Sequence, residues 1–278
     1  MVVQSLEREC MEFIPKTKPP ATKEAKITLY FLINDQELVV RHNQDRYFLP
    51  SKAEILSCNL DLQTARFLGL LDEHHCYALE VPAGVSLPDS LKSIPLRDIF
   101  AQFSANEIKA ISLAKQIITW DKQYRFCGQC GQPTIELSDE RAKVCRKCGL
   151  TNYPRLSPSI IVSVVKGKQI LLARSARFPK GMYSVLAGFV EPGETLEECI
   201  IREIDEEVGI KVKNIKYFGS QNWPFPHSLM IAFTTDYASG KIAIDNNEIV
   251  DAKWFTADDL PRLPGSYSIA RSMIDHFC

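Results

Sequence analysis

The stretch that decides the fold is GFVEPGETLEECIIREIDEEVGI, residues 188–210. Thr195 and Glu198 have the spacing of a helix-capping box, and Gly209 is a typical helix stop. The sequence therefore predicts a helix over residues 196–208. At about 100° per residue, its apolar side chains form one stripe, made of Leu196, Ile200, Ile204 and Val208.

The same stretch is strongly acidic, with eight acids and one base, Arg202. Glu203, Glu206 and Glu207 fall along one edge of the apolar stripe. Carboxylates one turn apart repel each other, so a cation or Arg202 has to offset the repulsion. An acidic block is compatible with a solvated helix face or with a site for hard cations, which prefer oxygen ligands. The position beside the buried stripe favours the cation site.

Four of the nine cysteines form two Cys-x-x-Cys-Gly pairs, Cys127 with Cys130 and Cys145 with Cys148. Two such pairs can present four thiolates tetrahedrally to one zinc ion, and four ligands leave no open position for catalysis. The pattern predicts a zinc ribbon with one structural Zn²⁺; a redox dithiol is the alternative. The odd number of cysteines argues against a disulfide framework.

Composition places the chain among ordinary globular proteins. It has 278 residues, 45% apolar and 24% charged, with a net charge of −1. The apolar runs are shorter than the ~18–20 residues of a membrane helix. The first residues lack the basic and apolar regions of a secretory signal. We therefore expect a cytoplasmic protein with no membrane partner, and the net charge does not indicate a nucleic-acid binder.

The ribbon separates two blocks of predicted strands and helices. Before it we expect strands at 26–33, 37–40 and 46–49 and a helix over 105–120, with His74 and His75 in turns or on the surface. After it we expect strands at 159–165, 169–173, 213–220 and 229–237 around the acidic helix. The predicted domains are an N-terminal, mostly-β α+β domain (1–122), the zinc ribbon (123–155) and an α/β domain (156–278).

Two motifs carry a family resemblance. Residues 188–210 match the Nudix box at every defined position, and SQNWPFPHS (220–228) is similar to the SQPWPFPxS signature of NADH pyrophosphatases, with Asn222 in place of a proline. From about residue 124 onward the chain resembles the zinc-ribbon NADH pyrophosphatases of the Nudix hydrolase family (the NudC type). This resemblance implies an α/β fold: a Nudix α/β/α sandwich with a mixed sheet, preceded by the ribbon and the N-terminal domain.

The resemblance also implies an activity and its metals. The expected reaction is hydrolysis of the NAD(H) pyrophosphate to nicotinamide mononucleotide and AMP, with removal of NAD caps from RNA 5′ ends by the same chemistry. More than one Mg²⁺ or Mn²⁺ ion would be held by the carbonyl of Ala187 and by the carboxylates of Glu203, Glu206, Glu207 and Glu248. Glu207 is the candidate general base, assisted by Glu203 and Glu206. Glu194 and Arg202 would form a structural ion pair.

By the same resemblance, the substrate is contacted mainly by aromatic residues, and the protein is a homodimer in which Tyr153 serves the partner subunit's site. Arg97 is a candidate phosphate contact in the N-terminal domain. The expected contacts are Glu140, Tyr153, Phe189, Gln221, Asn222, Trp223, Pro224, Phe225, Pro226, His227, Ser228 and Ala270.

Two other functions stay open at this point. One is a Nudix hydrolase of another dinucleotide, such as a diadenosine polyphosphate, or of ADP-ribose; the Trp-Pro-Phe-Pro segment disfavours both substrates. The other is a non-catalytic, zinc-ribbon regulator that binds nucleic acid through a basic face of the ribbon. That face would consist of Arg141, Lys143, Arg146 and Lys147. The complete carboxylate set favours the enzyme.

Overall fold

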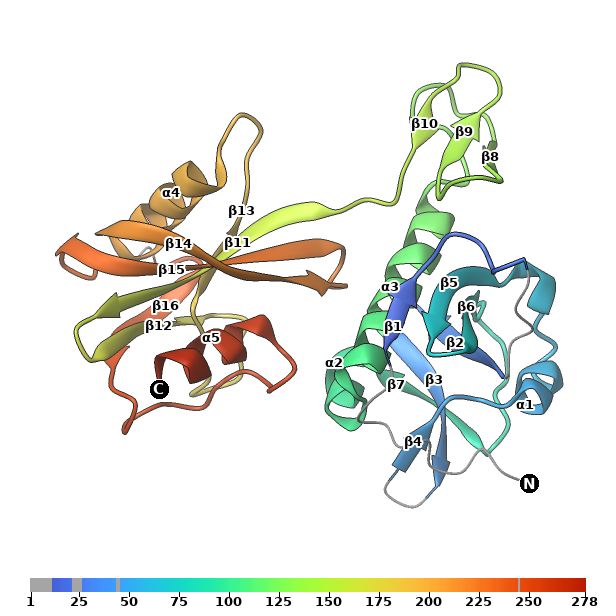
Figure 1. Cartoon of the computed structure of the whole chain (residues 1–278), viewed down its shortest axis with the longest axis horizontal. Coiled ribbons are helices and arrows are strands. Elements are labelled where there is room, and N and C mark those ends of the chain that lie inside the picture. Colours follow the sequence, from blue (N-terminus) through green and yellow to red (C-terminus); the bar gives the residue numbers. More distant parts are fainter. Residues whose placement is uncertain (1–11, 22–26, 44–45, 245) are drawn as a thin grey trace. The chain divides into compact units, whose positions relative to one another are not determined.

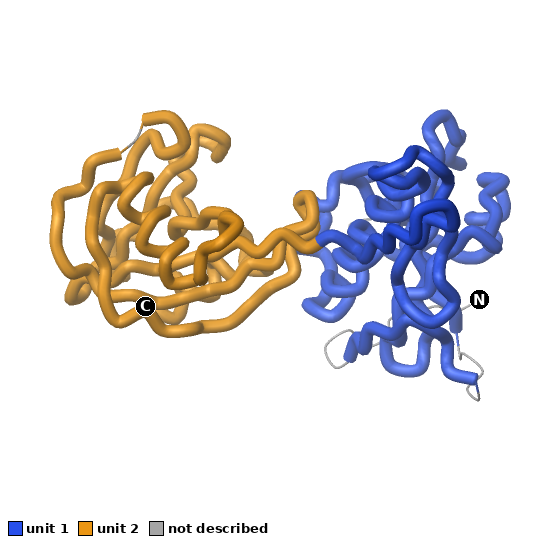
Figure 2. Tube along the Cα trace, turned by 90° about the horizontal axis from the view of Figure 1, so that it is seen from above, with its two compact units in different colours: residues 1–155 blue, residues 156–278 orange. Residues whose placement is uncertain are grey.

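The computed structural model describes residues 12–21, 27–43, 46–244 and 246–278. The chain divides into two compact units, Met1–Arg155 and Leu156–Cys278, each described here by itself (Figure 2). Within the described residues, the helices are too short or too polar to cross a membrane.

A mixed sheet forms the centre of the second unit (Figure 1). Its order is β14-β15-β11-β12-β16, and β13 pairs with β11. Strands β11 and β15 are parallel, and the other pairs are antiparallel. The strands are β11 (Ser157–Lys166), β12 (Gln169–Ser175), β13 (Leu186–Phe189), β14 (Ile210–Trp223), β15 (Ser228–Gly240) and β16 (Ile249–Phe255).

Helices α4 (Leu196–Val208) and α5 (Ile269–Phe277) pack against opposite faces of this sheet. Side chains alternate along a strand. Accordingly, Ile160 and Val162 of β11 join the apolar cluster beneath α4, whereas Ile161 joins the cluster beneath α5. The predicted α/β/α sandwich with a mixed sheet is therefore confirmed.

Helix α4 begins and ends where the sequence predicts. Thr195 Oγ1 accepts a hydrogen bond from the Glu198 amide (3.2 Å), and the Glu198 carboxylate accepts one from the Thr195 amide (2.8 Å). Gly209 ends the helix with φ of 68°, a left-handed conformation that glycine adopts without steric cost. Ile200, Ile204 and Val208 are fully buried, so the apolar stripe fixes which edge of the helix carries the glutamates.

The first unit contains a mixed sheet of seven described strands in the order β1-β5-β6-β2-β3-β4, with β7 paired to β3. Helix α3 (Ala105–Gln123) packs against it and continues three residues beyond the predicted end. The strands and shorter helices are β1 (Phe13–Pro15), β2 (Thr28–Asn34), β3 (Glu37–Asn43), β4 (Arg46–Phe48), α1 (Lys52–Ser57), η1 (Leu62–Thr64), β5 (Arg66–Leu71), β6 (His74–Glu80), β7 (Leu91–Pro95), α2 (Leu96–Ile99) and η2 (Phe100–Gln102).

The placement of His74 in a turn or on the surface was wrong. His74 opens β6 and is 6% exposed, because β6 is an inner strand between β5 and β2.

The ribbon strands β8 (Thr134–Glu136), β9 (Lys143–Cys145) and β10 (Thr151–Asn152) belong to the first unit. Lys143 is 5% exposed, and its Nζ lies 2.7 Å from Asp121 Oδ1 at the end of α3. Arg66 bridges Asp121 (3.2 Å) and Glu136 (2.8 Å). The buried Lys143–Asp121 pair and the partly exposed pairs of Arg66 fasten the ribbon to the N-terminal sheet and helix.

The expected basic face of the ribbon is therefore wrong for two of its four residues. Lys143 is buried against Asp121, and Arg141 donates to the backbone carbonyls of Phe67 (3.2 Å) and Leu68 (2.8 Å). Only Arg146 and Lys147 of that set are exposed.

Replacing Asp121 with alanine should destabilise the first unit by about 3–5 kcal/mol, because the buried Lys143 ammonium would lose its carboxylate. Urea denaturation of the full chain measures the loss. Asp139→Ala is the matched control, because the Lys18–Asp139 pair is exposed (52% and 85%) and should contribute less than about 1 kcal/mol. Equal effects of the two substitutions would contradict this account.

Candidate active site

The guanidinium group of Arg202 is the centre of the site in the second unit. Its Nε and Nη2 donate to the Glu194 carboxylate, the latter at 2.9 Å. Its Nη1 donates to Glu203 Oε1 (2.9 Å) and Glu206 Oε2 (3.0 Å), and Nη2 also donates to the carbonyl of Phe189 (3.0 Å). One cation thus joins the loop before α4, strand β13 and two glutamates of α4.

Glu203 lies against a strand that has no side chain at the point of contact. A Cβ atom on Gly188 would overlap the Glu203 carboxylate, so glycine is required for this approach. The Gly188 carbonyl accepts a hydrogen bond from Ser159 Oγ (2.9 Å), a buried hydroxyl on β11. This backbone is continuous with Ala187, whose carbonyl is an expected metal ligand.

The remaining glutamates differ in exposure. Glu207, one turn after Glu203, is 8% exposed, whereas the Glu206 side chain is 62% exposed. Glu248 is exposed and immediately precedes β16. Burial, together with the charges of Glu206 and Glu248, raises the pKa of Glu203, and Arg202 opposes this increase. The structure therefore brings Glu203, Glu206 and Glu248 within electrostatic reach of one another.

This donor set fits hard divalent cations. Mg²⁺ and Mn²⁺ prefer carboxylate and carbonyl oxygens, and Mg²⁺ usually retains several waters. Because Gly188 has no side chain, a carboxylate can lie directly on the strand at this point, an arrangement called the Gly188 cradle below. Within the described residues, only the four cysteines bring three or more ligand atoms within 4.8 Å of one another. The glutamates therefore fit water-completed ions better than one closed protein cage.

The four cysteine sulfurs form a compact set in the first unit. Cys127 Sγ lies 3.5 Å from Cys148 Sγ, and Cys130 Sγ lies 3.4 Å from Cys145 Sγ. A hydrogen bond from the backbone N–H of Cys148 contributes most to lowering the pKa of the Cys145 thiol to about 6. Four sulfurs, one partly prepared as a thiolate, fit a closed structural zinc site.

The signature segment ends β14 and forms the turn into β15. Trp223, the last residue of β14, contacts Phe225 in the turn edge-to-face, with ring centroids 5.3 Å apart. Asn222 continues the strand ladder opposite Leu229. His227 Nδ1 lies 3.1 Å from Ser157 Oγ. Pro224 and Ser228 are buried, and Pro226 is exposed.

Gln221 and Ala270 have internal side-chain contacts. The Gln221 amide donates to the Tyr267 carbonyl (2.7 Å), and its oxygen accepts from the Ile269 N–H (2.7 Å). The methyl group of Ala270 lies in the apolar cluster beneath α5, so a substrate would meet its backbone. Phe189, in contrast, is 51% exposed.

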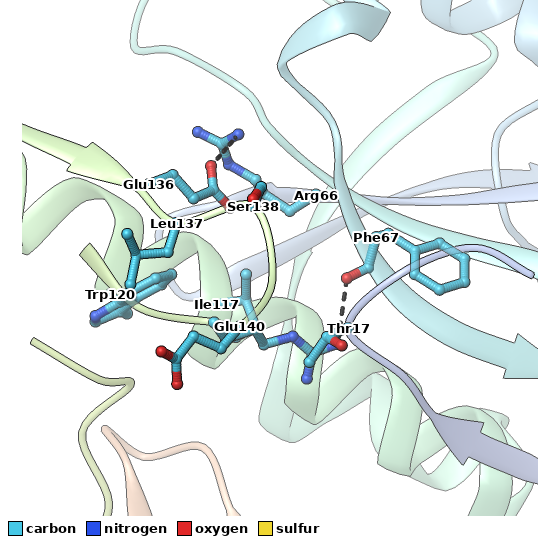
Figure 3. A pocket seen from close by; sticks show the side chains of 10 residues that line it. Thr17, Arg66, Phe67, Ile117, Trp120, Glu136, Leu137, Ser138 and Glu140 are labelled. Carbon is cyan, nitrogen blue, oxygen red and sulfur yellow. Dashed lines mark hydrogen bonds and ion pairs between the residues drawn. The ribbon is translucent and has the colours of Figure 1, made fainter. Parts of the chain in front are cut away.

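In the first unit, Glu140 lines a cavity of about 350 Å³ between the ribbon and the N-terminal sheet (Figure 3). Trp120, Arg66 and Arg141 line it as well. A hydrogen bond between Tyr153 and Glu140 raises the pKa of the Tyr153 hydroxyl, so two expected substrate contacts meet within one unit. Arg97 is exposed on α2, outside this cavity lining.

Comparison with known proteins identifies each part of the chain. The NUDIX domain profile matches residues 154–277, the NADH pyrophosphatase-like rudimentary NUDIX domain matches 27–120, and the NADH pyrophosphatase zinc ribbon domain matches 122–153. The fold, the box and these matches define a Nudix hydrolase.

Two similar proteins of known type narrow the class of Nudix hydrolase. The NAD-capped RNA hydrolase NudC of Pseudomonas putida KT2440 is 48% identical over 217 residues, which is 78% of each chain. The enzyme of that name from Pseudomonas aeruginosa LESB58 is 49% identical over 72% of this chain and 71% of its own. The chain belongs to the NudC family of Nudix hydrolases. A solved Nudix hydrolase from Nitrosomonas europaea is 21% identical over 55% of this chain and 91% of its own, with a TM-score of 0.46.

Sequence reasoning missed several residues that shape the site. The sequence does not show that Gly188 packs against Glu203, that Ser159 holds the Gly188 carbonyl, or that Tyr267 joins the aromatic cluster. Each acts through a partner distant in the sequence: 15 residues for Gly188, 29 for Ser159 and 46 for Tyr267. No local pattern signals such contacts.

Gly188→Ala should lower divalent-metal-dependent activity by about 100-fold, because the added methyl displaces the Glu203 carboxylate. Steady-state hydrolysis across a Mn²⁺ series measures the effect. Gly219→Ala is the control, since its Cβ would meet only Ile269 at 4.0 Å. Full activity of Gly188→Ala would contradict the claim that the Glu203 carboxylate needs the space left by Gly188.

The Glu194–Arg202 pair should make stability depend on pH at the acid end. Hydrogen bonds from Arg202 lower the pKa of Glu194 from 4.5 to about 2. A depressed carboxylate pKa stabilises the fold above pH 4.5, and this contribution is lost as the pH falls toward 2. The stability difference between wild type and Glu194→Gln should therefore shrink across that window. A difference independent of pH in urea unfolding would count against the pair.

Proposed function

We propose that this chain hydrolyses the pyrophosphate of NAD(H) to nicotinamide mononucleotide and AMP, and that it removes NAD from the 5′ ends of capped RNA. The observation that carries the proposal is the Arg202-centred carboxylate cluster, with Glu203 seated on Gly188. The relatives named as NAD-capped RNA hydrolases and the two NADH pyrophosphatase domain matches support this choice of substrate.

Glu203, Glu206, Glu207 and Glu248, with the carbonyl of Ala187, would hold more than one Mg²⁺ or Mn²⁺ ion. Divalent cations there supply charge neutralisation of the pyrophosphate and lower the pKa of the attacking water. Arg202 fixes the directions of Glu203 and Glu206, and it ties them to the Phe189 carbonyl.

Glu207 is the proposed general base. Its carboxylate takes a proton from water as the water oxygen forms a bond to phosphorus. The bond from that phosphorus to the bridging oxygen breaks, and the bridging oxygen leaves with the other phosphate. The products are the two mononucleotides, and the proton is later released to solvent. The Glu207 side chain is buried on α4, one helical turn after Glu203.

We also propose the finer organisation of the protein. The proposed domains are the N-terminal α+β domain (1–122), the zinc ribbon (123–155) and the Nudix domain (156–278). The ribbon would hold one structural zinc ion. We propose a homodimer in which Tyr153 and Glu140 reach the partner subunit's substrate. Arg97 remains a candidate phosphate contact. The ion pairs that Lys143 and Arg66 form with Asp121 support a structural role for the ribbon.

The non-catalytic, nucleic-acid-binding alternative loses support. Two of its four basic ribbon residues, Arg141 and Lys143, are engaged inside the first unit. A regulator also has no need for a glycine cradle under Glu203.

In the presence of Mn²⁺, the purified, zinc-loaded protein should hydrolyse NADH to reduced nicotinamide mononucleotide and AMP, and EDTA should abolish the reaction. Glu207→Gln should lower kcat by at least about 100-fold while zinc content stays unchanged. Chromatography of the products and metal analysis measure both. Lys253→Gln is the matched control, since Lys253 is an exposed residue paired with Asp251. Activity of Glu207→Gln above a tenth of wild type would remove Glu207 from its role as base.

A further inference from the structure

Beyond the signature segment, a third aromatic ring belongs to the same cluster. Tyr267, in the loop before α5, lies nearly parallel to Trp223, with an interplanar angle of 14° and ring centroids 6.2 Å apart. Phe225 contacts the Trp223 ring edge-to-face, with centroids 5.3 Å apart. All three side chains are half-buried.

The position of Tyr267 is fixed by two independent contacts. Gln221 binds its carbonyl and the N–H of Ile269, so β14 is fastened to the start of α5 on both sides of Ser268. A Cβ on Gly265 would overlap the Tyr267 ring, so the ring folds back over bare backbone. Ser268 closes this loop by donating to the Gly265 carbonyl (2.8 Å).

The aromatic cluster lies on the same sheet as β13, the strand on which the Glu203 carboxylate packs. Trp223 is opposite Ser228, Ser228 is opposite Ser157, and two residues further along β11, Ser159 is opposite Phe189. Three strand spacings of about 4.8 Å separate β14 from β13, or about 14 Å. The cluster lies on the α5 face of the sheet, whereas Glu203 packs on Gly188 from the α4 face. A dinucleotide with its pyrophosphate at the glutamates would therefore extend a base toward the cluster past the exposed ring of Phe189, which is on the cluster's face.

We infer that Tyr267 is a specificity-determining residue, whose ring extends the Trp223–Phe225 surface to bind a planar heteroaromatic base of the dinucleotide. Partly exposed aromatic rings held in fixed positions stack on bases and so contribute to their binding. This inference rests on the proposed function. It makes Gln221 a positioning residue that acts through Tyr267.

The test compares NADH hydrolysis by full-length wild type, Tyr267→Ala and Tyr267→Phe. Tyr267→Ala should raise KM at least about fivefold, with kcat changed less than about twofold, because the ring binds the base away from the reacting phosphorus. Tyr267→Phe keeps the ring and should stay within about twofold of wild type. Tyr217→Ala is the matched control, since Tyr217 is 64% exposed on β14 and packs on Phe233. Tyr267→Leu replaces the alanine variant should that variant fail to fold.

A binding measurement separates this inference from the proposed reaction. Nicotinamide mononucleotide and AMP are titrated separately while tryptophan fluorescence is followed. At least one should quench wild type, and Tyr267→Ala should need a severalfold higher concentration of it; the nucleotide affected identifies the base. Unchanged KM and unchanged titrations in Tyr267→Ala would overturn the inference. Absence of NADH hydrolysis by wild type would overturn only the reaction, because the titrations still test the ring.

Discussion

The second unit depends on how one guanidinium group is shared among carboxylates. Arg202 contacts Glu194, Glu203 and Glu206 and also reaches a carbonyl of β13. Without it, glutamates one helical turn apart would repel one another and the loop before α4 would lose its attachment. The arrangement places several oxygens on one side of the helix at a modest electrostatic cost. An acidic helix can thereby serve as a site for divalent cations and remain stably folded.

Packing determines where that charge network can form. The stripe of Ile200, Ile204 and Val208 sets the rotation of α4 on the sheet, and this rotation directs Glu203 onto Gly188. Ser159 on the central strand then holds the carbonyl of the same glycine. Helix, edge strand and central strand thus fix one another, and a side chain at residue 188 would displace the Glu203 carboxylate.

The sequence was sufficient for features that are local. Caps, the apolar stripe and the cysteine spacing predicted α4 and the compact four-sulfur cluster, because each depends on neighbours within a turn or a short loop. The family resemblance supplied the α/β/α sandwich and the chemistry. Lys143 shows where such reasoning fails: its basic side chain suggested a solvated face, yet Asp121, 22 residues earlier, draws it into the interior. The place of Tyr267 is not predictable for the same reason, because Gln221, which binds its carbonyl, lies 46 residues earlier.

The central claim is that the Arg202-organised glutamates hold the divalent ions that hydrolysis needs. The most direct test is Mn²⁺ titration of the zinc-loaded full chain, followed by electron paramagnetic resonance, with NADH hydrolysis measured on the same samples. The account predicts that activity rises in proportion to bound Mn²⁺, and that Glu203→Gln weakens both together. Hydrolysis that proceeds unchanged when Mn²⁺ no longer binds would contradict it.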